Sequence, residues 1–413
     1  DVCSSDLKIL GKTDLYGGAN MKTKIAIFIL LSFLICMFAG ASISSAGDPG
    51  VSDNQILVGA ILDQTGRMAF LGKEIHHGAK LYFRYINEKG GVHGRKIKLL
   101  VEDDMGQAPR TLAALKKLVG RDKIFCIFTT LGQAATDAVV PYLEEKKIPL
   151  IAPFSQNSGL IHPPKRYIFQ ATVSTEIQGR LIIDFIANQL KKSKTKIGTL
   201  VQADIYGEDL MKGLTRQAEK YGIKFVAVEK FKPGAVDFSP QLQRLRRAGV
   251  EIIVMVGVVR EPAAVLKEVK NMGWPVQVIG PSATSSPAVL MLAGEASEGF
   301  ISMAIAASLT SDHPGVKLYK ELIHKDDPKH RIGFFSQVGF EAAMVFVEGL
   351  RATGKDLTRE NLITGLEKMK DFNAMGVSLT FGPDDREGGT SSFFLKAVNG
   401  KYIPISDWMT VTD

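Results

Sequence analysis

The pattern of hydrophobic and polar positions switches between two periods along most of the chain. Residues 56–62 form a nearly continuous apolar run, typical of a parallel strand covered on both faces. After turn residues at 63–67, apolar side chains recur at steps of three and four, which predicts a helix with one apolar face. Its apolar positions are Leu71, Ile75, Ala79, Tyr82, Phe83 and Ile86. Gly90 and Gly91 end this helix, and a second strand is expected at 97–101.

This alternation continues in two series of similar length. Strands of the first series are expected at 124–129, 148–152 and 167–170, and those of the second at 196–201, 225–231, 251–256 and 276–279. Helical patterns separate the strands, which predicts parallel sheets flanked by helices. After residue 284 the pattern weakens, and it recovers in a long helix at 335–353. The sequence therefore predicts an α/β fold with two lobes and a ligand cleft between them.

The first part of the chain has a different character. Residues 1–20 fit no fold pattern and precede Met21, so we interpret them as upstream sequence. Residues 21–46 have a positive start, an apolar stretch and small residues before Ala46, which indicates a secretory signal peptide. The apolar stretch is short for a membrane span. The bulky Ile35 before Cys36 argues against lipoprotein anchoring, so we expect an exported, periplasmic protein.

Several motifs carry a resemblance to a known family. In chain order they are Thr65-Gly66, Ile86-Asn87, Gly90-Gly91, Gly94, Asp103-Asp104, Ile148-Pro149, Tyr206-Gly207, Asp237-Phe238-Ser239 and Thr380-Phe381-Gly382. This ordered set resembles the leucine/isoleucine/valine-binding family of periplasmic solute-binding proteins, the substrate-binding proteins of branched-chain amino acid ABC transporters. The resemblance covers essentially residues 54–408.

The resemblance implies a type I periplasmic-binding-protein fold, in which two lobes close like a Venus flytrap on a ligand. It places lobe 1 at 54–173 plus 285–378, and lobe 2 at 174–284 plus 379–413. It also implies a receptor that captures an amino acid, branched or otherwise apolar, by hinge closure and delivers it to a membrane permease. Such a receptor needs no cofactor and is not an enzyme.

Ligands of open α/β sheets bind at the carboxyl ends of strands, which directs attention to the loops there. Thr129 and Thr130 end a strand just before an expected helix, and their hydroxyls with free helix N–H groups suit a carboxylate. The resemblance places the carboxylate-binding serine of the family at Thr129. A plain helix cap without a ligand is the alternative.

The next loop and one helix position depart from the family pattern. Phe154, Ser155 and Gln156 stand where the family has small residues and a threonine, and Leu71 stands where a relative has tyrosine. Backbone contacts to a ligand can survive these changes, whereas side-chain specificity should differ. An amide, or an aromatic or aliphatic carboxylate, is therefore an alternative solute.

Two second-lobe residues complete the predicted site. Tyr206 follows a strand, so its ring can cover a ligand while its hydroxyl reaches a polar atom; a surface turn is the alternative. By resemblance, Glu261 pairs with an α-ammonium group, and the alternative is a helix cap or a local pair with Arg260. Arg67 can meet a second carboxylate or simply face solvent.

Other function classes lack support. The net charge of +8 is spread along the 413 residues without a basic tract interleaved with aromatic side chains, which argues against nucleic-acid binding. Zinc-ligand spacing, a phosphate-binding loop and a Gly-x-Ser-x-Gly motif are absent from the sequence, and we interpret Asp103-Asp104 as a strand-end turn. A ligand-sensing module of a signalling system would need a transmembrane segment after the lobes, and none precedes Asp413.

The lone Cys126 of the expected mature chain is predicted to be a small buried hydrophobe.

Overall fold

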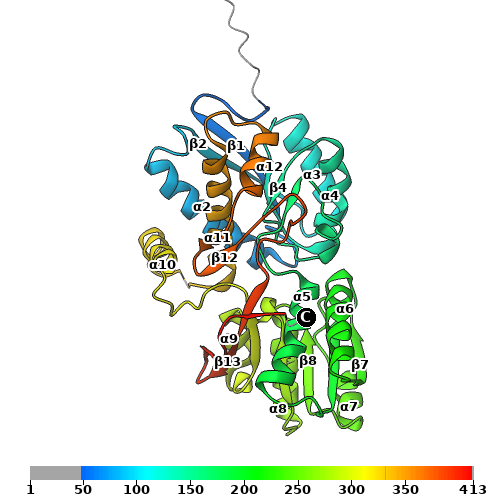
Figure 1. Ribbon diagram of the computed structural model, residues 1–413. Helices are drawn as coiled ribbons and strands as arrows, with labels where there is room; N and C mark the ends of the chain where they lie inside the picture. The colour runs from blue at the N-terminus through cyan, green and yellow to red at the C-terminus, as the bar shows by residue number, and fades with distance from the viewer. Residues whose placement is uncertain (1–47, 331, 412–413) are drawn as a thin grey trace, which may run out of the picture. The chain divides into compact units, whose positions relative to one another are not determined.

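Two β-sheets, each flanked by helices, organise residues 48–330 and 332–411, the part of the chain that this computed structural model describes (Figure 1). The expected upstream segment 1–20 and signal peptide 21–46 lie outside the described residues. The predicted two-lobed α/β architecture is confirmed. Within the described residues no helix is both long and apolar enough to cross a membrane.

The first lobe contains a five-stranded sheet in the order β2-β1-β3-β4-β5, and all its pairings are parallel. Its strands are β1 (Gln55–Leu62), β2 (Lys96–Asp103), β3 (Ile127–Thr130), β4 (Leu150–Ile151) and β5 (Ile168–Phe169). Its helices are α2 (Ala69–Glu88), α3 (Ala108–Gly120), α4 (Gln133–Glu145), α10 (Pro314–Asp326), α11 (Phe334–Thr353) and α12 (Arg359–Glu367). A two-stranded hairpin of β11 (Phe372–Ala374) and β12 (Val377–Leu379) follows α12.

The second lobe is built on the strand order β14-β13-β10-β9-β8-β6-β7, parallel from β10 to β7 and antiparallel at β13 and β14. Its strands are β6 (Ile197–Gln202), β7 (Phe225–Phe231), β8 (Ile252–Val256), β9 (Gln277–Gly280), β10 (Ile301–Ala304), β13 (Ser391–Val398) and β14 (Lys401–Pro404), with β15 (Met409–Thr410) paired to β13. Its helices are α5 (Thr175–Asp184), α6 (Ile205–Lys220), α7 (Ser239–Arg247), α8 (Arg260–Asn271) and α9 (Pro287–Ala293).

The region after residue 284, where the sequence pattern weakens, belongs at first to the second lobe. Strand β10 pairs with β9 and β13, so the chain returns to the first lobe after Ala304 and not near residue 285. The expected boundary is therefore wrong at this crossing. All four residues of β10 are buried, and so short a strand shows no alternation from which it could be recognised.

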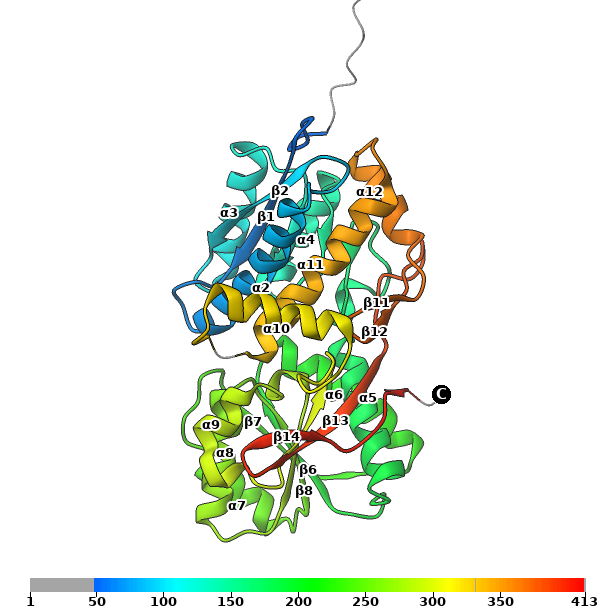
Figure 2. The same cartoon turned by 90° about the vertical axis from the view of Figure 1, so that its left-hand side faces the viewer.

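Three connections join the lobes, after β5, after β10 and before β13 (Figure 2). The first and third lie side by side, because the Gln170 N–H donates to the Arg386 carbonyl (2.9 Å) and the Gly388 N–H donates to the Gln170 carbonyl (2.8 Å). These backbone bonds fix the crossing segments to each other at the junction of the lobes.

Glycines allow one helix pair in each lobe to approach closely. A Cβ atom at Gly78 of α2 would lie 1.8 Å from the Ser336 carbonyl oxygen of α11, and one at Gly213 of α6 would lie 1.8 Å from the Glu176 carbonyl oxygen of α5. Glycine costs roughly 1 kcal/mol relative to alanine inside a helix. Its presence at these contacts is explained by the backbone of the facing helix, which leaves no space for a side chain.

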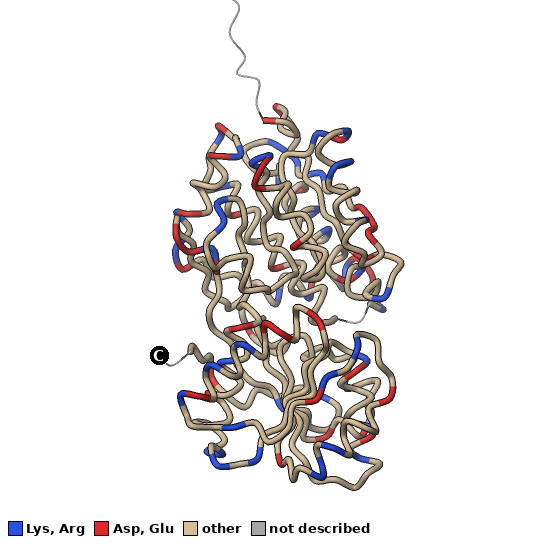
Figure 3. Tube along the Cα trace, turned by 90° about the vertical axis from the view of Figure 1, so that its right-hand side faces the viewer, with Lys and Arg blue, Asp and Glu red and all other residues tan. Residues whose placement is uncertain are grey.

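Positive and negative residues are interspersed along the chain trace in both lobes, in agreement with the sequence (Figure 3). Cys126 is fully buried beside β3, and burial raises the pKa of its thiol. Its predicted role as a small buried hydrophobe is confirmed.

Candidate functional site

A cavity of about 290 Å³ lies between the lobes, at the carboxyl ends of strands from both sheets. The predicted residues Leu71, Phe154, Ser155, Gln156 and Tyr206 all line it. Its apolar wall also includes Met68, Leu131, Val258 and Phe335. The cavity volume is at the small end of ligand pockets, which span about 300–1,000 Å³.

Carboxylates at the ends of β1 and β2 hold the first-lobe loops around the cavity. Buried Asp63 accepts the N–H of Met68 at 2.7 Å, while Asp103 accepts the N–H of Gln64 (2.8 Å) and the hydroxyl of Thr65 (2.6 Å). Asp104 accepts the hydroxyl of Thr111 at 2.8 Å. These bonds confirm that Asp103 and Asp104 form a strand-end turn.

Thr129 and Thr130 lie behind the cavity and do not line it. The Thr129 hydroxyl donates to the Ala152 carbonyl (2.8 Å), and the Thr130 hydroxyl bonds that of Thr136 (2.7 Å). Their hydroxyls thus have protein partners, and a ligand role for them stays a prediction.

The backbone that follows these two threonines does reach the cavity. Gly132, at a φ of 94°, turns the chain into α4, whose first residues Gln133, Ala134 and Ala135 line the cavity. No side chain caps this helix start. Free N–H groups and the positive end of the helix dipole make it a suitable place for a carboxylate.

Four buried polar atoms in the cavity lining have no hydrogen-bond partner in the protein. They are Gln133 Oε1, Ser155 Oγ, Gln202 Oε1 and the Tyr206 hydroxyl. Buried polar groups are nearly always satisfied in native proteins, so a cluster of unsatisfied ones around a cavity points to a ligand that completes them.

The two glutamines present acceptors to the cavity. The Gln202 side-chain N–H₂ donates to the carboxylate of Asp204, which orients the amide and leaves its oxygen free. The Gln133 side-chain N–H₂ donates to the Thr175 hydroxyl at 3.0 Å, a bond between the two lobes. The free acceptors favour a ligand that carries N–H donors.

The cavity lining also includes charged residues. Asp204 lines the cavity, caps α6 by accepting the Gly207 N–H at 3.1 Å, and stands near Tyr206. Burial, and then the carboxylates of Asp204 and Glu261, raise the pKa of Tyr206, so its phenol stays protonated and can donate at neutral pH. Arg67 lines the cavity from the first lobe and is itself exposed.

Glu261, the expected ammonium partner, does not line the cavity. It is buried in the first turn of α8, where its carboxylate accepts the Gly234 N–H at 3.1 Å. A Cβ atom at Gly234 would lie 3.7 Å from Arg67 Cδ, so Glu261 supports the second-lobe loop that meets Arg67. Asp204 is the acidic residue of the cavity lining, and an ammonium role for Glu261 stays a prediction.

Several lining residues were missed from the sequence, and Asp204, Gln202 and Phe335 are the most informative of them. Gln202 is the last residue of β6 and Asp204 follows that strand. Both could have been found, because a helix-capping Asp at a strand end belongs to the class of loops already singled out. Phe335 could not, because it lies in the first turn of a helix far along the chain from the first-lobe lining loops, and only the fold brings it to the cavity.

No cluster of three or more His, Cys, Asp or Glu side chains in the described ranges is arranged to hold a metal ion.

The chain is similar to known proteins in both sequence and fold. A family model described as periplasmic binding protein matches residues 55–401. The leucine-, isoleucine-, valine-, threonine-, and alanine-binding protein of Pseudomonas aeruginosa is 24% identical over 320 residues, which is 77% of this chain and 84% of that protein.

Two solved structures share the fold. A branched-chain amino acid ABC transporter protein from Thermus thermophilus with bound valine has a TM-score of 0.81 and 26% identity, over 87% of this chain and 97% of the other. A fatty acid ABC transporter substrate-binding protein from Thermomonospora curvata has a TM-score of 0.79 and 23% identity, over 88% and 94%.

Proposed function

Since the chain belongs to the periplasmic binding protein family, we propose that it is the extracytoplasmic receptor of an ABC importer. It captures an amino acid, branched or otherwise apolar, between its lobes and delivers it to a membrane permease. The observation that carries the proposal is the group of four unpartnered polar atoms around one small, largely apolar cavity.

Each part of an amino acid has a counterpart in the lining. We assign the carboxylate to the start of α4, with the unpartnered hydroxyls of Ser155 and Tyr206 as further donors. The α-ammonium is placed at the amide oxygens of Gln133 and Gln202 and at the carboxylate of Asp204. The side chain packs on the apolar wall.

The composition of the lining supports hinge closure. Residues of both lobes contribute to the cavity, so a solute that binds there bridges the lobes and is desolvated when they close. The closed form then presents one joined surface to the permease. This role places the protein in the periplasm and involves no cofactor.

The alternative solute is a carboxylate or amide without an α-amino group. The structure from Thermomonospora curvata is named for fatty acids, and at 23% identity it supports the fold alone. A carboxylic acid without an amine would leave the amide oxygens of Gln133 and Gln202 without a partner. It would also bring its negative charge close to these oxygens. The acceptor set therefore favours an amine.

A ligand series tests this proposal. Calorimetric titration of the purified protein should show binding of leucine, and 4-methylpentanoate, which lacks only the amine, should bind at least about 100-fold more weakly because buried acceptors stay unpaired. Asp204→Asn keeps the helix cap and removes the charge, so it should weaken leucine binding by about 10- to 100-fold.

The matched control is Asp237→Asn, at a second carboxylate of the same lobe, which accepts the Ser239 N–H at the start of α7 and lies outside the cavity lining. It should leave the affinity for leucine unchanged. Equal binding of leucine and 4-methylpentanoate would contradict the amino-acid assignment and keep the receptor role, whereas no binding across amino acids, amides and carboxylates would contradict both.

A second prediction concerns the Tyr206 hydroxyl. Tyr206→Phe removes an atom that has no partner in the protein, so the free energy of unfolding without ligand should stay the same or rise. Leucine binding should weaken by about 10-fold or more, because the phenol donates to a charged carboxylate.

Thr199→Val is its control, since Thr199 Oγ1 is likewise buried and unpartnered but lies outside the cavity lining. It should stabilise the protein without any change in affinity. Chemical denaturation and calorimetry measure the two effects. Unchanged leucine affinity in Tyr206→Phe would remove this residue from the site.

A further inference from the structure

A second and larger groove, of about 1140 Å³, opens between the lobes beside the cavity. Its first-lobe wall comes from α2 and the start of α11, and its second-lobe wall from α8, α9 and the turn between β13 and β14. Its apolar lining includes Phe70, Pro287, Leu290, Met291, Ile332 and Phe334. Phe70 and Met291 are more than half exposed, at 54% and 59%.

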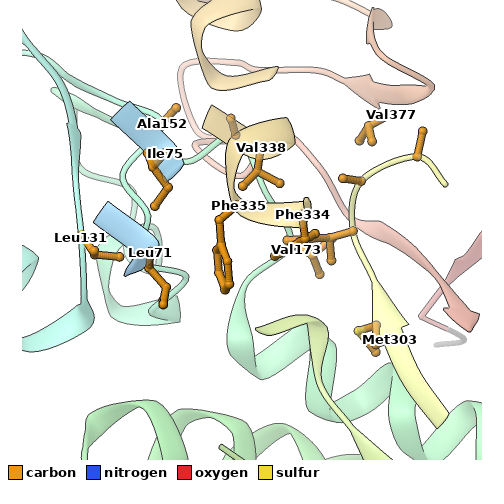
Figure 4. Packing of buried hydrophobic residues seen from close by; sticks show 14 of the residues in the cluster. Leu71, Ile75, Leu131, Ala152, Val173, Met303, Phe334, Phe335, Val338 and Val377 are labelled. Carbon is orange, nitrogen blue, oxygen red and sulfur yellow. The ribbon is translucent and has the colours of Figure 1, made fainter. Parts of the chain in front are cut away.

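One side chain, Phe335, belongs to the lining of both spaces. Its ring centroid lies 6.1 Å from that of Phe154 in the cavity, and 6.5 Å and 5.2 Å from those of Phe70 and Phe334 in the groove. Figure 4 shows the ring pointing away from its helix, with Leu71 of the cavity on one side and Phe334 on the other. A single aromatic ring thus forms the partition.

The two spaces differ in the polar groups that they leave free. The cavity holds the four unpartnered polar atoms, whereas no described residue of the groove lining carries a buried side-chain nitrogen or oxygen without a partner. Charged residues of the groove pair with each other, His330 with Glu74 at 3.1 Å and Lys270 with Glu295 at 2.9 Å. The cavity therefore suits a polar head group, and the apolar part of the groove lining suits an apolar chain.

We propose that the cavity and the groove form one binding site for amino acids with a long, unbranched apolar side chain. The head group occupies the cavity, the Phe335 ring turns aside, and the chain extends into the groove. This inference rests on the proposed function, which accounts for the head group of the ligand. It adds a statement about the kind of side chain that the ligand carries. Continuity with the cavity through one side chain favours this occupant over a separate protein segment.

A homologous series of straight-chain amino acids tests the inference. Calorimetric titration would use norvaline, norleucine, 2-aminooctanoate and 2-aminodecanoate with the purified protein. Affinity should rise by about three- to fourfold for each added methylene that enters the groove, as expected for burial of apolar surface. Affinity that levels off or falls beyond norleucine would overturn the inference, while binding of norvaline would still support the receptor function.

Two variants at neighbouring positions test whether the side chain of the ligand lies in the groove. Met291→Asp places a charge in the groove lining and should abolish the gain in affinity for 2-aminodecanoate, at least 10-fold, with norvaline binding unchanged. Leu292→Asp makes the same change at the next position of α9, which is 41% exposed and outside the groove lining, and should affect neither ligand. Equal effects of the two variants would overturn the inference, and failure of norvaline itself to bind would refute the proposed function as well.

Discussion

Replacing Arg386 with methionine is expected to lower the free energy of unfolding by about 3–5 kcal/mol, the usual effect of breaking a buried ion pair by removing one partner. Arg386 is 2% exposed and lies in the connection that precedes β13. Its guanidinium donates to Glu367 at 2.7 Å and to the carbonyls of Lys165 and Gly382, and it stacks over the Phe169 ring at 4.4 Å. Methionine keeps much of the apolar volume and leaves these acceptors unpaired.

The control is Arg166→Met, which breaks an ion pair with Glu360 at 2.6 Å whose partners are both about half exposed. That pair is screened by water, so the change should stay within about 1 kcal/mol. Urea denaturation of the three proteins measures the difference. A loss of less than about 1 kcal/mol in Arg386→Met would show that the crossing does not depend on this guanidinium.

The role of Arg386 illustrates which parts of the fold a sequence conceals. Strand β1 and helix α2 were predicted to within about two residues because each shows its period over many positions. Arg386 stands in a polar stretch that reads as a loop, and its burial depends on α12 and β5, far away in the chain. Local patterns contain no information about such long-range packing.

In the candidate site, too, some features could be predicted from local sequence and others depend on the folded structure. The rule that ligands bind at the carboxyl ends of strands identified the loops of Phe154 and Tyr206, and both residues line the cavity. It could not tell which side chain in a loop faces inward, because that depends on the hydrogen bonds each makes after folding. The Thr129 hydroxyl turns to the Ala152 carbonyl, and Glu261 turns to the Gly234 N–H.

Replacing Glu387, the residue next to Arg386, is expected to give the second large change in the free energy of unfolding. Its carboxylate accepts the Ser174 N–H just before α5 begins, and the side chain is 4% exposed. Burial raises the pKa of Glu387 from 4.5 to about 7, with smaller contributions from Asp385 and Glu176, while the bond from Ser174 opposes the rise. His162 Nε2 lies 3.6 Å from the other carboxylate oxygen.

The direction of the pH effect follows from the raised pKa. Below pH 4.5 the group is protonated in both the folded and the unfolded state, and it costs nothing. As the pH rises toward 7, the unfolded state releases the proton first, so stability is lost through this interval. The full cost, reached above pH 7, is about 3 kcal/mol for the two pKa values.

Glu387→Gln should therefore stabilise the protein in a pH-dependent way. Glutamine keeps an oxygen for the Ser174 N–H and cannot ionise, so the variant should exceed the wild type in free energy of unfolding by up to about 3 kcal/mol at pH 8 and match it near pH 4. Glu360→Gln provides a contrast of opposite sign, because its bonds from Arg166 and Tyr167 lower the pKa of Glu360. Urea denaturation from pH 4 to pH 8 measures both. A Glu387→Gln variant less stable than the wild type at pH 8 would mean that the ionised carboxylate holds the start of α5 more strongly than burial opposes it.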